Sequence, residues 1–337
     1  MKAVGYRDAG PIDRPDSLVD ITLDKPVPAG RDLLVEVKAV SVNPVDTKVR
    51  TRAGAVGAGY KVLGWDAAGI VVGVGDAVTG YAVGDEVYYA GDLTRPGANS
   101  EFHVVDERIV GRKPKTLSMP EAAAIPLTAI TAWEMLFERV DVRRAVPGAA
   151  NAVLIIGAAG GVGSIAIQLV RALTDLTVIA TASRPETRDW AVELGAHHVV
   201  DHREPLARQV ADLGIGAPGF VFSTNGTGAH LAEIASLIAP QGRFGLIDDP
   251  EALAVNAFKQ KSVSVHWEFM YTRSMFQTPD MDAQRTLLDE VAALIDAGRV
   301  RTTLTETLGL VTAANLKAAH AKLESGTARG KIVLEGF

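Results

Sequence analysis

The stretch NAVLIIGAAGGVGSIAIQLVR, residues 151–171, decides the fold class of this chain. Four apolar residues at 153–156 precede a glycine-rich turn, and apolar residues at 165–170 continue over the length of a helix. The pattern predicts a buried parallel strand, a tight turn and a helix. Glycines bring the backbone close to a ligand, and the helix start offers free N–H groups and a positive dipole end, so the turn suits a pyrophosphate. The residues expected to hold it are Ala159, Gly160, Gly161, Val162 and Gly163.

The glycine turn taken alone leaves two interpretations open. Against the template G-x-G-x-x-G, positions 158, 160 and 163 read Ala, Gly and Gly, so the first glycine is missing. A strand-to-helix turn that binds no ligand is the alternative. The rest of the chain has to decide between them.

Composition limits the function classes. A chain of 337 residues suggests two domains, and a hydrophobic content of 47% supports large cores. The net charge is −6 and Lys and Arg are spread along the chain, so we expect no nucleic-acid role. No apolar run is long enough for a membrane span and the N-terminus lacks a signal-peptide pattern, so we expect a cytoplasmic protein. The absence of cysteine excludes disulfides, iron–sulfur clusters and thiolate zinc sites.

The order of elements predicts two kinds of domain. Up to about residue 110, short β-rich runs alternate with turns, which indicates a β-barrel-like unit with strands at 33–42, 67–75, 85–91 and 100–105. Helices begin after Ser118, which is placed as a cap with Glu121 three residues on. Helices then alternate with strands at 153–156, 176–183, 197–202, 219–226, 242–247 and 261–271. Such alternation predicts a parallel sheet that binds ligands beyond the carboxyl ends of its strands.

The fold class is therefore α/β, with two domains. We expect a discontinuous β-rich domain, residues 1–122 and 274–337, because the tail ends in the short strand KIVLE. The doubly wound parallel-sheet domain is expected at residues 123–273. Its strand 261–271 has no later partner, so we expect a homodimer formed through this edge. The Met–aromatic piece WEFMYTRSMF, residues 267–276, is expected in the core or an interface, and a loop over the acceptor formed by part of 271–279 is the alternative.

The segment after the second strand of the parallel sheet bears on the choice of nucleotide. An acidic residue about 20 positions after the glycines usually holds the ribose 2′-OH, but this position is Ser183. Arg184 follows directly and Arg188 lies one helical turn further on. Arginine binds a 2′-phosphate with charge-assisted, bidentate hydrogen bonds, so NADPH is favoured over NADH. A solvated helix start is the alternative for both arginines.

Several segments together carry a family resemblance. The chain resembles the medium-chain dehydrogenase/reductase superfamily and, within it, the zinc-free NADPH:quinone oxidoreductases related to zeta-crystallin, including relatives labelled zinc-type alcohol dehydrogenase-like. The resemblance implies a GroES-like catalytic domain, a Rossmann domain and hydride transfer from a nicotinamide. The matching segments follow the family's order along the chain: SVNPVDTKVR (41–50), GWDAAGIVVGVGDAVTGYAVGDEV (64–87), EAAAIPLTAITAWEML (121–136), IGAAGGVGSIAIQL (156–169), ELGAHHVVDH (193–202) and GKIVL (330–334).

The resemblance also locates the zinc ligands of metal-dependent members. Those members have a Cys where this chain has Asn43, and a His followed by Glu where it has Trp65 and Asp66. Asn and Trp are not zinc ligands of that class, so no metal is expected. Quinones and conjugated enones accept hydride without a Lewis acid, because hydrogen-bond donors can stabilise the delocalised charge that forms.

The remaining site residues come from the resemblance, each beside a structural alternative. Asn43 is placed beside the nicotinamide, or else shapes the turn before Pro44. Asp46, with Lys48, is a candidate proton relay, or else a solvated loop charge. The resemblance also implies nucleotide contacts at Thr131, or else a helix-start hydroxyl bonded to its own backbone, at His202, and at Lys331, or else a plain surface lysine. Asn225 and Leu246 are expected to face the nicotinamide half, because they lie at the carboxyl edge of the parallel sheet. The cluster of His197, His198, Asp201 and His202 is not a metal site, because strand alternation separates the first two histidines.

These inferences predict a metal-independent, NADPH-dependent oxidoreductase that reduces a quinone or an α,β-unsaturated carbonyl compound. Metal-free carbonyl or alcohol chemistry is a second possibility. A nucleotide-binding, redox-sensing protein without turnover is a third. Activity with NADPH across a panel of acceptors separates the three.

Overall fold

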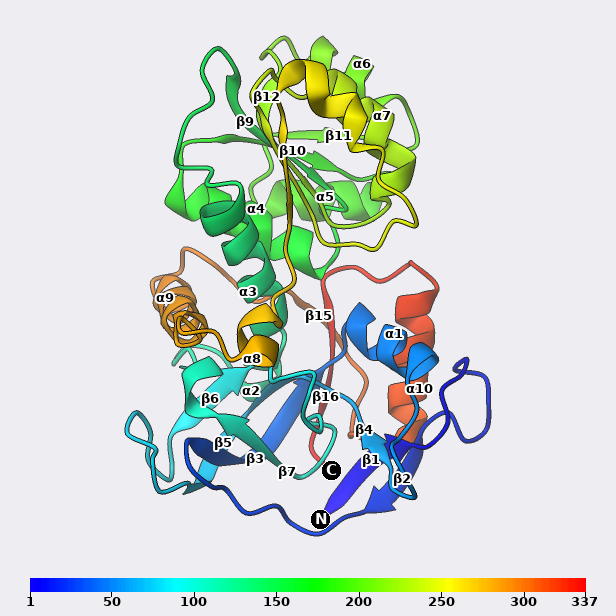
Figure 1. Ribbon diagram of the computed structural model, residues 1–337, viewed down its shortest axis with the longest axis vertical. Helices are drawn as coiled ribbons and strands as arrows, with labels where there is room; N and C mark the ends of the chain where they lie inside the picture. Colours follow the sequence, from blue (N-terminus) through cyan, green and yellow to red (C-terminus); the bar gives the residue numbers. More distant parts are fainter. The chain divides into compact units, whose positions relative to one another are not determined.

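The computed structural model describes residues 1–337, which form two compact units (Figure 1). The first unit comprises residues 1–130 and 271–337, and the second comprises residues 131–270. The chain enters the second unit within α3 (Pro126–Trp133). The expected boundaries lie after residues 122 and 273, whereas the compact units divide after residues 130 and 270.

The first unit is built on a seven-stranded sheet with the order β15-β16-β3-β5-β6-β8, and β7 also pairs with β3. The terminal strand β16 (Lys331–Glu335) lies antiparallel to β3 (Asp32–Ser41), which places the C-terminal tail in this β-rich unit. A three-stranded sheet, β2-β1-β4, accompanies it. The other strands are β1 (Lys2–Tyr6), β2 (Val19–Thr22), β4 (Lys61–Val62), β5 (Asp66–Val74), β6 (Glu86–Tyr89), β7 (Phe102–Asp106), β8 (Val110–Arg112) and β15 (Leu304–Thr307).

The helical stretch predicted from residue 120 is interrupted. Ser118 caps α2 (Met119–Ala123), and the carboxylate of Glu121 accepts the Ser118 N–H at 2.9 Å, as a capping box requires. Pro126 then starts a new helix, α3, because its missing N–H is tolerated only in a first turn. After α3 the chain continues as a π-helical turn, η2 (Glu134–Arg139). The other helices of the first unit are α1 (Pro44–Arg52), η1 (Glu107–Ile109), α8 (Thr272–Phe276), α9 (Ala283–Asp296) and α10 (Ala313–Glu324).

The second unit contains a six-stranded, entirely parallel sheet with the order β11-β10-β9-β12-β13-β14. Its strands are β9 (Ala150–Ile156), β10 (Thr177–Thr181), β11 (His198–Val200), β12 (Pro218–Ser223), β13 (Arg243–Leu246) and β14 (Ser264–Trp267). Its helices are α4 (Gly161–Leu173), α5 (Pro185–Glu193), α6 (Leu206–Asp212), α7 (Thr227–Leu237) and the 3₁₀ segment η3 (Val255–Lys261). The predicted α/β fold, with a β-rich part and a doubly wound parallel sheet, is confirmed.

The predicted strand at 153–156 is buried on both faces, which explains its continuous apolar run. Leu154 and Ile156 belong to a core cluster that includes side chains of α6 and α7. Val153 and Ile155 point to the opposite face of the sheet and are also fully buried. A strand covered on both faces needs apolar residues at every position.

Strand β14 lies at the edge of the parallel sheet. Trp267, on this strand, and Phe269, just beyond it, are 55% and 49% exposed. The homodimer expected through residues 261–271 stays a prediction.

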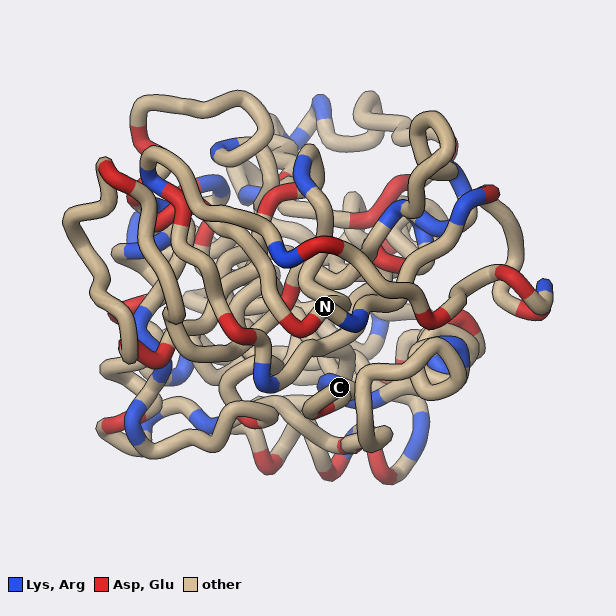
Figure 2. The backbone as a smooth tube through the Cα atoms, turned by 90° about the horizontal axis from the view of Figure 1, so that it is seen from below, with Lys and Arg blue, Asp and Glu red and all other residues tan.

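Acidic and basic residues are interspersed along the backbone seen in Figure 2. None of the helices combines the length and apolar character that crossing a bilayer requires.

Candidate functional site

A buried polar network forms in the first unit where β3, β5 and β16 lie side by side. Ser41, the last residue of β3, pairs with Asp66 of β5 and with Val333 of β16. This register brings Asp66 and Lys331 to either side of the chain that continues from β3 into Asn43. Residues separated by 288 positions in the sequence therefore meet at one point.

Lys331 is 3% exposed, and its ammonium group is fully used by the network. Its Nζ donates to the Val42 carbonyl at 3.0 Å, to the Asn43 side-chain oxygen, and to Oδ2 of Asp66 at 3.0 Å. An ammonium group has three N–H donors, so none remains for a nucleotide. The structure places Lys331, expected among the nucleotide contacts, in this network of the first unit.

Asn43 is also fully engaged. Its Nδ2 donates to Oδ2 of Asp66 at 3.0 Å and to the Ser41 carbonyl at 3.3 Å, and the residue is 1% exposed. Asp66 receives a further hydrogen bond from the Leu127 N–H at 2.9 Å. Asn43 precedes Pro44 as the N-cap of α1, as the turn interpretation expected. Its carboxamide is held in one orientation and offers no free N–H to a substrate oxygen.

Asp46, the candidate proton relay, lies in the first turn of α1 and is completely buried. Its Oδ2 accepts the Asn43 N–H at 2.7 Å and its Oδ1 accepts the Gly64 N–H at 3.0 Å. Burial raises the pKa of Asp46 to about 7, and the neighbouring charge of Asp66 acts in the same direction. The two N–H bonds and the Lys331 charge lower this pKa without cancelling the effect of burial.

The raised pKa of Asp46 predicts a specific pH dependence of stability. An aspartate titrates near 3.9 in an unfolded chain, so the native state holds this proton more tightly. The protonated Asp46 side chain therefore contributes to the free energy of unfolding. This contribution is complete below about pH 4 and is lost as the pH rises to about 7. We expect wild-type stability to fall by roughly 2–4 kcal/mol over this range relative to Asp46→Asn. Urea unfolding at several pH values measures this difference, and parallel curves for the two proteins would contradict it.

The predicted glycine turn in the second unit has the geometry of a dinucleotide site. Gly157, not residue 158, has the left-handed conformation, with φ of 77°, so the tight turn begins one residue before the template position. Its N–H donates to Oγ1 of Thr181 at 3.1 Å. A Cβ on Gly163 would lie 2.5 Å from both the Ala158 Cα and the Gly157 carbonyl oxygen, so only glycine permits this packing of α4 on β9. The sequence analysis missed Gly157, although the residue adjoins the motif.

Gly160 has a different environment from Gly163. It is the N-cap of α4, and a Cβ there would meet only the Gly157 carbonyl oxygen, at 3.4 Å. The protein itself therefore leaves space above Gly160. The helix begins at Gly161, and the N–H groups of its first turn have no partner within the helix. This combination fits an anionic diphosphate.

The carboxyl ends of the neighbouring parallel strands lie in register with this turn. Ile156 of β9 pairs with Ser223 of β12, which in turn pairs with Leu246 of β13. Leu246 is buried at the strand end, and Asn225 follows β12 in the turn that leads to α7. The structure therefore brings the predicted contacts Asn225 and Leu246 to the sheet edge that carries the glycine turn. Thr131 is 5% exposed and lies within α3.

The turn from β10 to α5 gathers several guanidinium groups around Ser183. Arg184 is the N-cap of α5; its Nε lies 2.8 Å from Oε1 of Glu186, and its side chain is 38% exposed. Arg203 donates to the Ser183 carbonyl at 3.0 Å and pairs with Asp201 at 2.7 Å, with 64% of its side chain exposed. The sequence analysis missed Arg203, which reaches this turn from beyond β11.

Arg188 and His202 have other surroundings. Arg188 donates to the Ala182 carbonyl at 3.3 Å and to the Val199 carbonyl at 3.1 Å, so it ties the ends of β10 and β11 together. The ring of His202 lies edge-on to that of His230 with 6.4 Å between centroids. Partial burial lowers the pKa of His202, which favours its neutral form.

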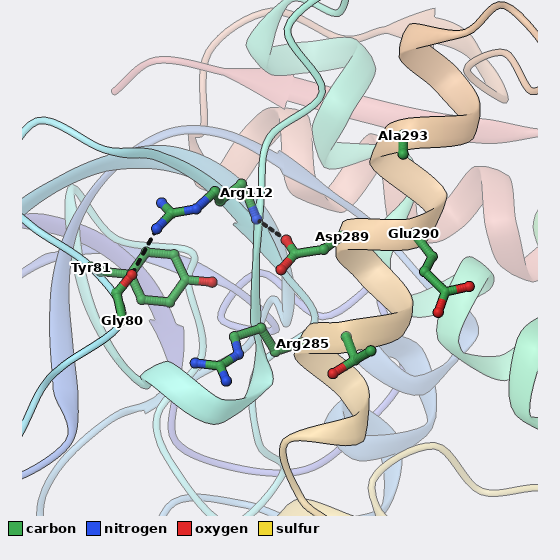
Figure 3. A pocket seen from close by; sticks show the side chains of 8 residues that line it. Gly80, Tyr81, Arg112, Arg285, Asp289, Glu290 and Ala293 are labelled. Atoms are coloured by element: carbon green, nitrogen blue, oxygen red, sulfur yellow. Dashed lines mark hydrogen bonds between the residues drawn. The ribbon is translucent and has the colours of Figure 1, made fainter.

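An open pocket of about 490 Å³ in the first unit shares no residue with the polar network (Figure 3). Its wall carries two arginines, Arg112 and Arg285, and two carboxylates, Asp289 and Glu290. Arg112 donates through its backbone N–H to Asp289 at 2.9 Å and through its guanidinium to the Gly80 carbonyl at 2.8 Å. The charges of the wall balance, so this pocket favours neither an anionic nor a cationic ligand.

Comparison with known proteins identifies the family. The model of the alcohol dehydrogenase GroES-like domain matches residues 29–115, and that of the zinc-binding dehydrogenase matches residues 194–334. A zinc-type alcohol dehydrogenase-like protein from Staphylococcus aureus (strain MSSA476) is 37% identical over 336 residues, which cover 99% of each chain. The chain belongs to the medium-chain dehydrogenase/reductase superfamily. It is an oxidoreductase of this type, with a GroES-like domain and a Rossmann-like parallel sheet.

Two solved structures agree with this assignment to the medium-chain dehydrogenase/reductase superfamily. A protein from Rhizobium etli CFN 42, described as a candidate zinc-dependent alcohol dehydrogenase, is 65% identical with a TM-score of 0.99, covering 100% of this chain and 98% of its own. A quinone oxidoreductase from Pseudomonas syringae pv. Tomato DC3000 is 26% identical with a TM-score of 0.83, covering 99% of both chains.

The names of several relatives raise the question of zinc, and the side chains present do not fit this ion. The Asn43 side-chain oxygen and Asp66 Oδ2 both accept hydrogen bonds from the Lys331 ammonium group. The Trp65 ring nitrogen carries only a hydrogen, which it donates to the Asp92 carbonyl at 3.0 Å. Zinc sites in proteins use thiolate, imidazole and carboxylate ligands, and here the single carboxylate is already paired with a cation.

Proposed function

We propose that this protein is a metal-independent, NADPH-dependent oxidoreductase that reduces a quinone or an α,β-unsaturated carbonyl compound. The observation that carries the proposal is the polar network of the first unit. Asn43 and Trp65 are not zinc ligands, and Asp66 is neutralised by Lys331. An acceptor that delocalises the incoming charge suits a site whose residues supply no Lewis acid.

The residues of the second unit support the choice of cofactor. Bound NADPH supplies the hydride. The space above Gly160 and the first turn of α4 accommodate its diphosphate. Arg184 and Arg203 lie at the β10–α5 turn and are exposed enough to bind a 2′-phosphate. No carboxylate stands at position 183, where it would repel this phosphate.

A quinone oxidoreductase of known structure, the Pseudomonas syringae protein, shares the fold over the full chain and supports the proposed acceptor class. The proton that completes the reduction comes from solvent in this proposal. Asp46 is completely buried and both its oxygens accept backbone N–H groups, so it supports the start of α1 and does not face a substrate.

The test compares NADPH and NADH as donors to 1,4-naphthoquinone, a simple enone and a simple aldehyde. We expect turnover with NADPH and the first two acceptors. Arg184→Ala combined with Arg203→Ala is expected to raise the KM for NADPH roughly 10- to 100-fold, since each variant removes a charge-assisted hydrogen bond. The KM for NADH should stay unchanged, because NADH has no 2′-phosphate.

Arg208→Ala is the matched control, because this arginine lies on α6 with 84% of its side chain exposed. It should leave both constants at wild-type values. Equal use of NADPH and NADH by the wild type would contradict the assignment of the arginines. Tight NADPH binding without turnover of any acceptor would favour a redox-sensing protein, and activity confined to aldehydes would favour carbonyl chemistry.

A further inference from the structure

Lys331 takes no part in the proposed reaction, yet it carries one of the most deeply buried charges of the first unit. The residue is 3% exposed and its partner Asp66 is 0% exposed. A buried ion pair of this kind adds little stability over apolar side chains of similar volume, because both charges must leave water. Its presence beside Asn43 therefore indicates a role in positioning.

Three oxygen atoms surround the Lys331 nitrogen: the Val42 carbonyl, the Asn43 side-chain oxygen and Asp66 Oδ2. They belong to the chain leaving β3 and to the start of β5, two of the strands that meet at the network. The ammonium group thus has an all-oxygen environment with one negative charge. Every donor is satisfied, and so are both oxygens of Asp66.

The Asn43 carboxamide is held from both sides by this ion pair. Its oxygen accepts from Lys331 and its nitrogen donates to Asp66 at 3.0 Å. Exchanging the amide oxygen and nitrogen would place N–H against ammonium and oxygen against carboxylate. The ion pair therefore fixes the orientation of Asn43 at the start of α1.

We propose that the Lys331 ammonium group is a built-in cation, standing among the residues that replace the zinc ligands of metal-dependent relatives, and that it positions Asn43 both directly and through Asp66. The Lys331 charge neutralises Asp66, the one carboxylate among the residues at the zinc-ligand positions, and leaves zinc without a free ligand at these positions. Lys331 is a positioning residue, because it acts through Asn43. Only the kinetic part of the test rests on the proposed function.

The test uses Lys331→Met, which removes the charge, and the double variant Lys331→Met/Asp66→Asn, which removes both charges. Lys113→Met is the matched control. Lys113 is 5% exposed at its side chain and is equally satisfied, by Glu86 at 3.2 Å and by two backbone carbonyls, but it does not touch Asn43. Each protein is stripped with a chelator, exposed to zinc chloride, desalted and analysed for zinc by mass spectrometry.

Thermal unfolding supplies the second readout. Lys331→Met leaves Asp66 buried and unpaired, so its Tm should fall by about 10 °C. The double variant should recover at least half of this loss, because no charge is left without a partner. Lys113→Met should lower the Tm by clearly less than Lys331→Met, since its partner Glu86 is half-exposed and regains water.

Kinetics separate positioning from a merely structural role. If Lys331, by holding Asn43, fixes the start of α1 at the site of hydride transfer, Lys331→Met should lower kcat roughly 10- to 100-fold and leave the KM for NADPH unchanged. A raised KM for NADPH with unchanged kcat would overturn the proposal, because Lys331 would then serve the cofactor. The double variant should regain part of the kcat if the orientation of Asn43 recovers with the Tm.

Zinc content decides the first half of the proposal without any turnover. The wild type should retain only traces of zinc. One zinc per wild-type chain, lost in Asp66→Asn, would overturn the proposal. Failure of the wild type to reduce any acceptor would refute the proposed function, whereas the zinc and Tm results would still test whether Lys331 pairs with Asp66 and keeps this carboxylate from zinc.

Discussion

Gly163→Ala is expected to weaken NADPH binding at least 100-fold, because the new Cβ would lie 2.5 Å from two backbone atoms of the turn. These atoms, the Ala158 Cα and the Gly157 carbonyl oxygen, cannot move without displacing β9 or α4. Strand β9 is held between β10 and β12, so the helix start has to shift and the diphosphate loses its N–H groups. Overpacking of this kind should also cost about 1–3 kcal/mol of unfolding free energy.

Gly160→Ala is the matched variant for the same turn. Its Cβ would meet only one protein atom, at 3.4 Å, and the backbone φ of −73° is acceptable for alanine. We expect unfolding free energy within about 0.5 kcal/mol of the wild type. NADPH affinity should nevertheless fall roughly tenfold or more, because the methyl group would occupy the space that the diphosphate needs.

Fluorescence titration with NADPH and urea unfolding of both glycine variants provide the two measurements. We expect Gly163→Ala to lose both NADPH affinity and stability, and Gly160→Ala to lose NADPH affinity alone. This pair of results would place the diphosphate above Gly160. Wild-type affinity in Gly160→Ala would show that the cofactor does not use this turn. Wild-type stability in Gly163→Ala would contradict the close packing of α4 on β9.

Arg50→Met is expected to destabilise the first unit by about 3–5 kcal/mol, since it removes one partner of a buried polar network. The Arg50 side chain is completely buried in α1. Its Nε lies 3.3 Å from Nδ1 of His320, its guanidinium donates to the Gly10 carbonyl at 2.5 Å, and it pairs with Glu324. Burial and the Arg50 charge lower the pKa of His320 to about 3, so this ring stays neutral.

The loss of Arg50 would leave the Gly10 carbonyl and Glu324 without their donor and would loosen α1 from α10. Because Asn43 is the N-cap of α1, loosening this helix should also disturb the network of Asn43, Asp66 and Lys331, so activity should decline with stability. Lys38→Met is the control, since Lys38 pairs with Glu36 at 2.6 Å but keeps 37% of its side chain exposed. We expect it to cost less than about 1 kcal/mol. Similar losses in the two variants by urea unfolding would argue against the network.

The parallel sheet could be predicted from the sequence because its signals are local. Strand β9 is buried on both faces and reads as a continuous apolar run, and each glycine turn or cap marks where a strand or helix ends. The capping box at Ser118 is a signal of the same kind and is present in the structure. The interruption at Pro126 was missed, because the apolar spacing continues across it while the proline removes the N–H that a continuous helix needs.

The geometry of the glycine turn could be predicted only in part from the sequence. The template places its first glycine at residue 158, where the sequence has alanine, and this made the motif weak. In the structure Gly157 adopts the left-handed conformation, so the glycine that begins the turn lies one residue before the template position. Backbone dihedral angles decide which glycine adopts the left-handed conformation of the turn. A sequence template of fixed spacing carries no information on these angles.

By itself, the sequence determined the α/β class, the position of a glycine-rich turn between β9 and α4, and the absence of thiolate ligands, since these depend on residues that are neighbours in the chain. Only the tertiary structure decided the partners of Asn43. Strand register places Ser41 between Asp66 and Val333, so Lys331 reaches Asn43 from 288 residues away. The expectation for Lys331 is a nucleotide contact or a plain surface lysine. Its three N–H groups instead end on three buried oxygens, because an ammonium group removed from water must satisfy every donor within the protein.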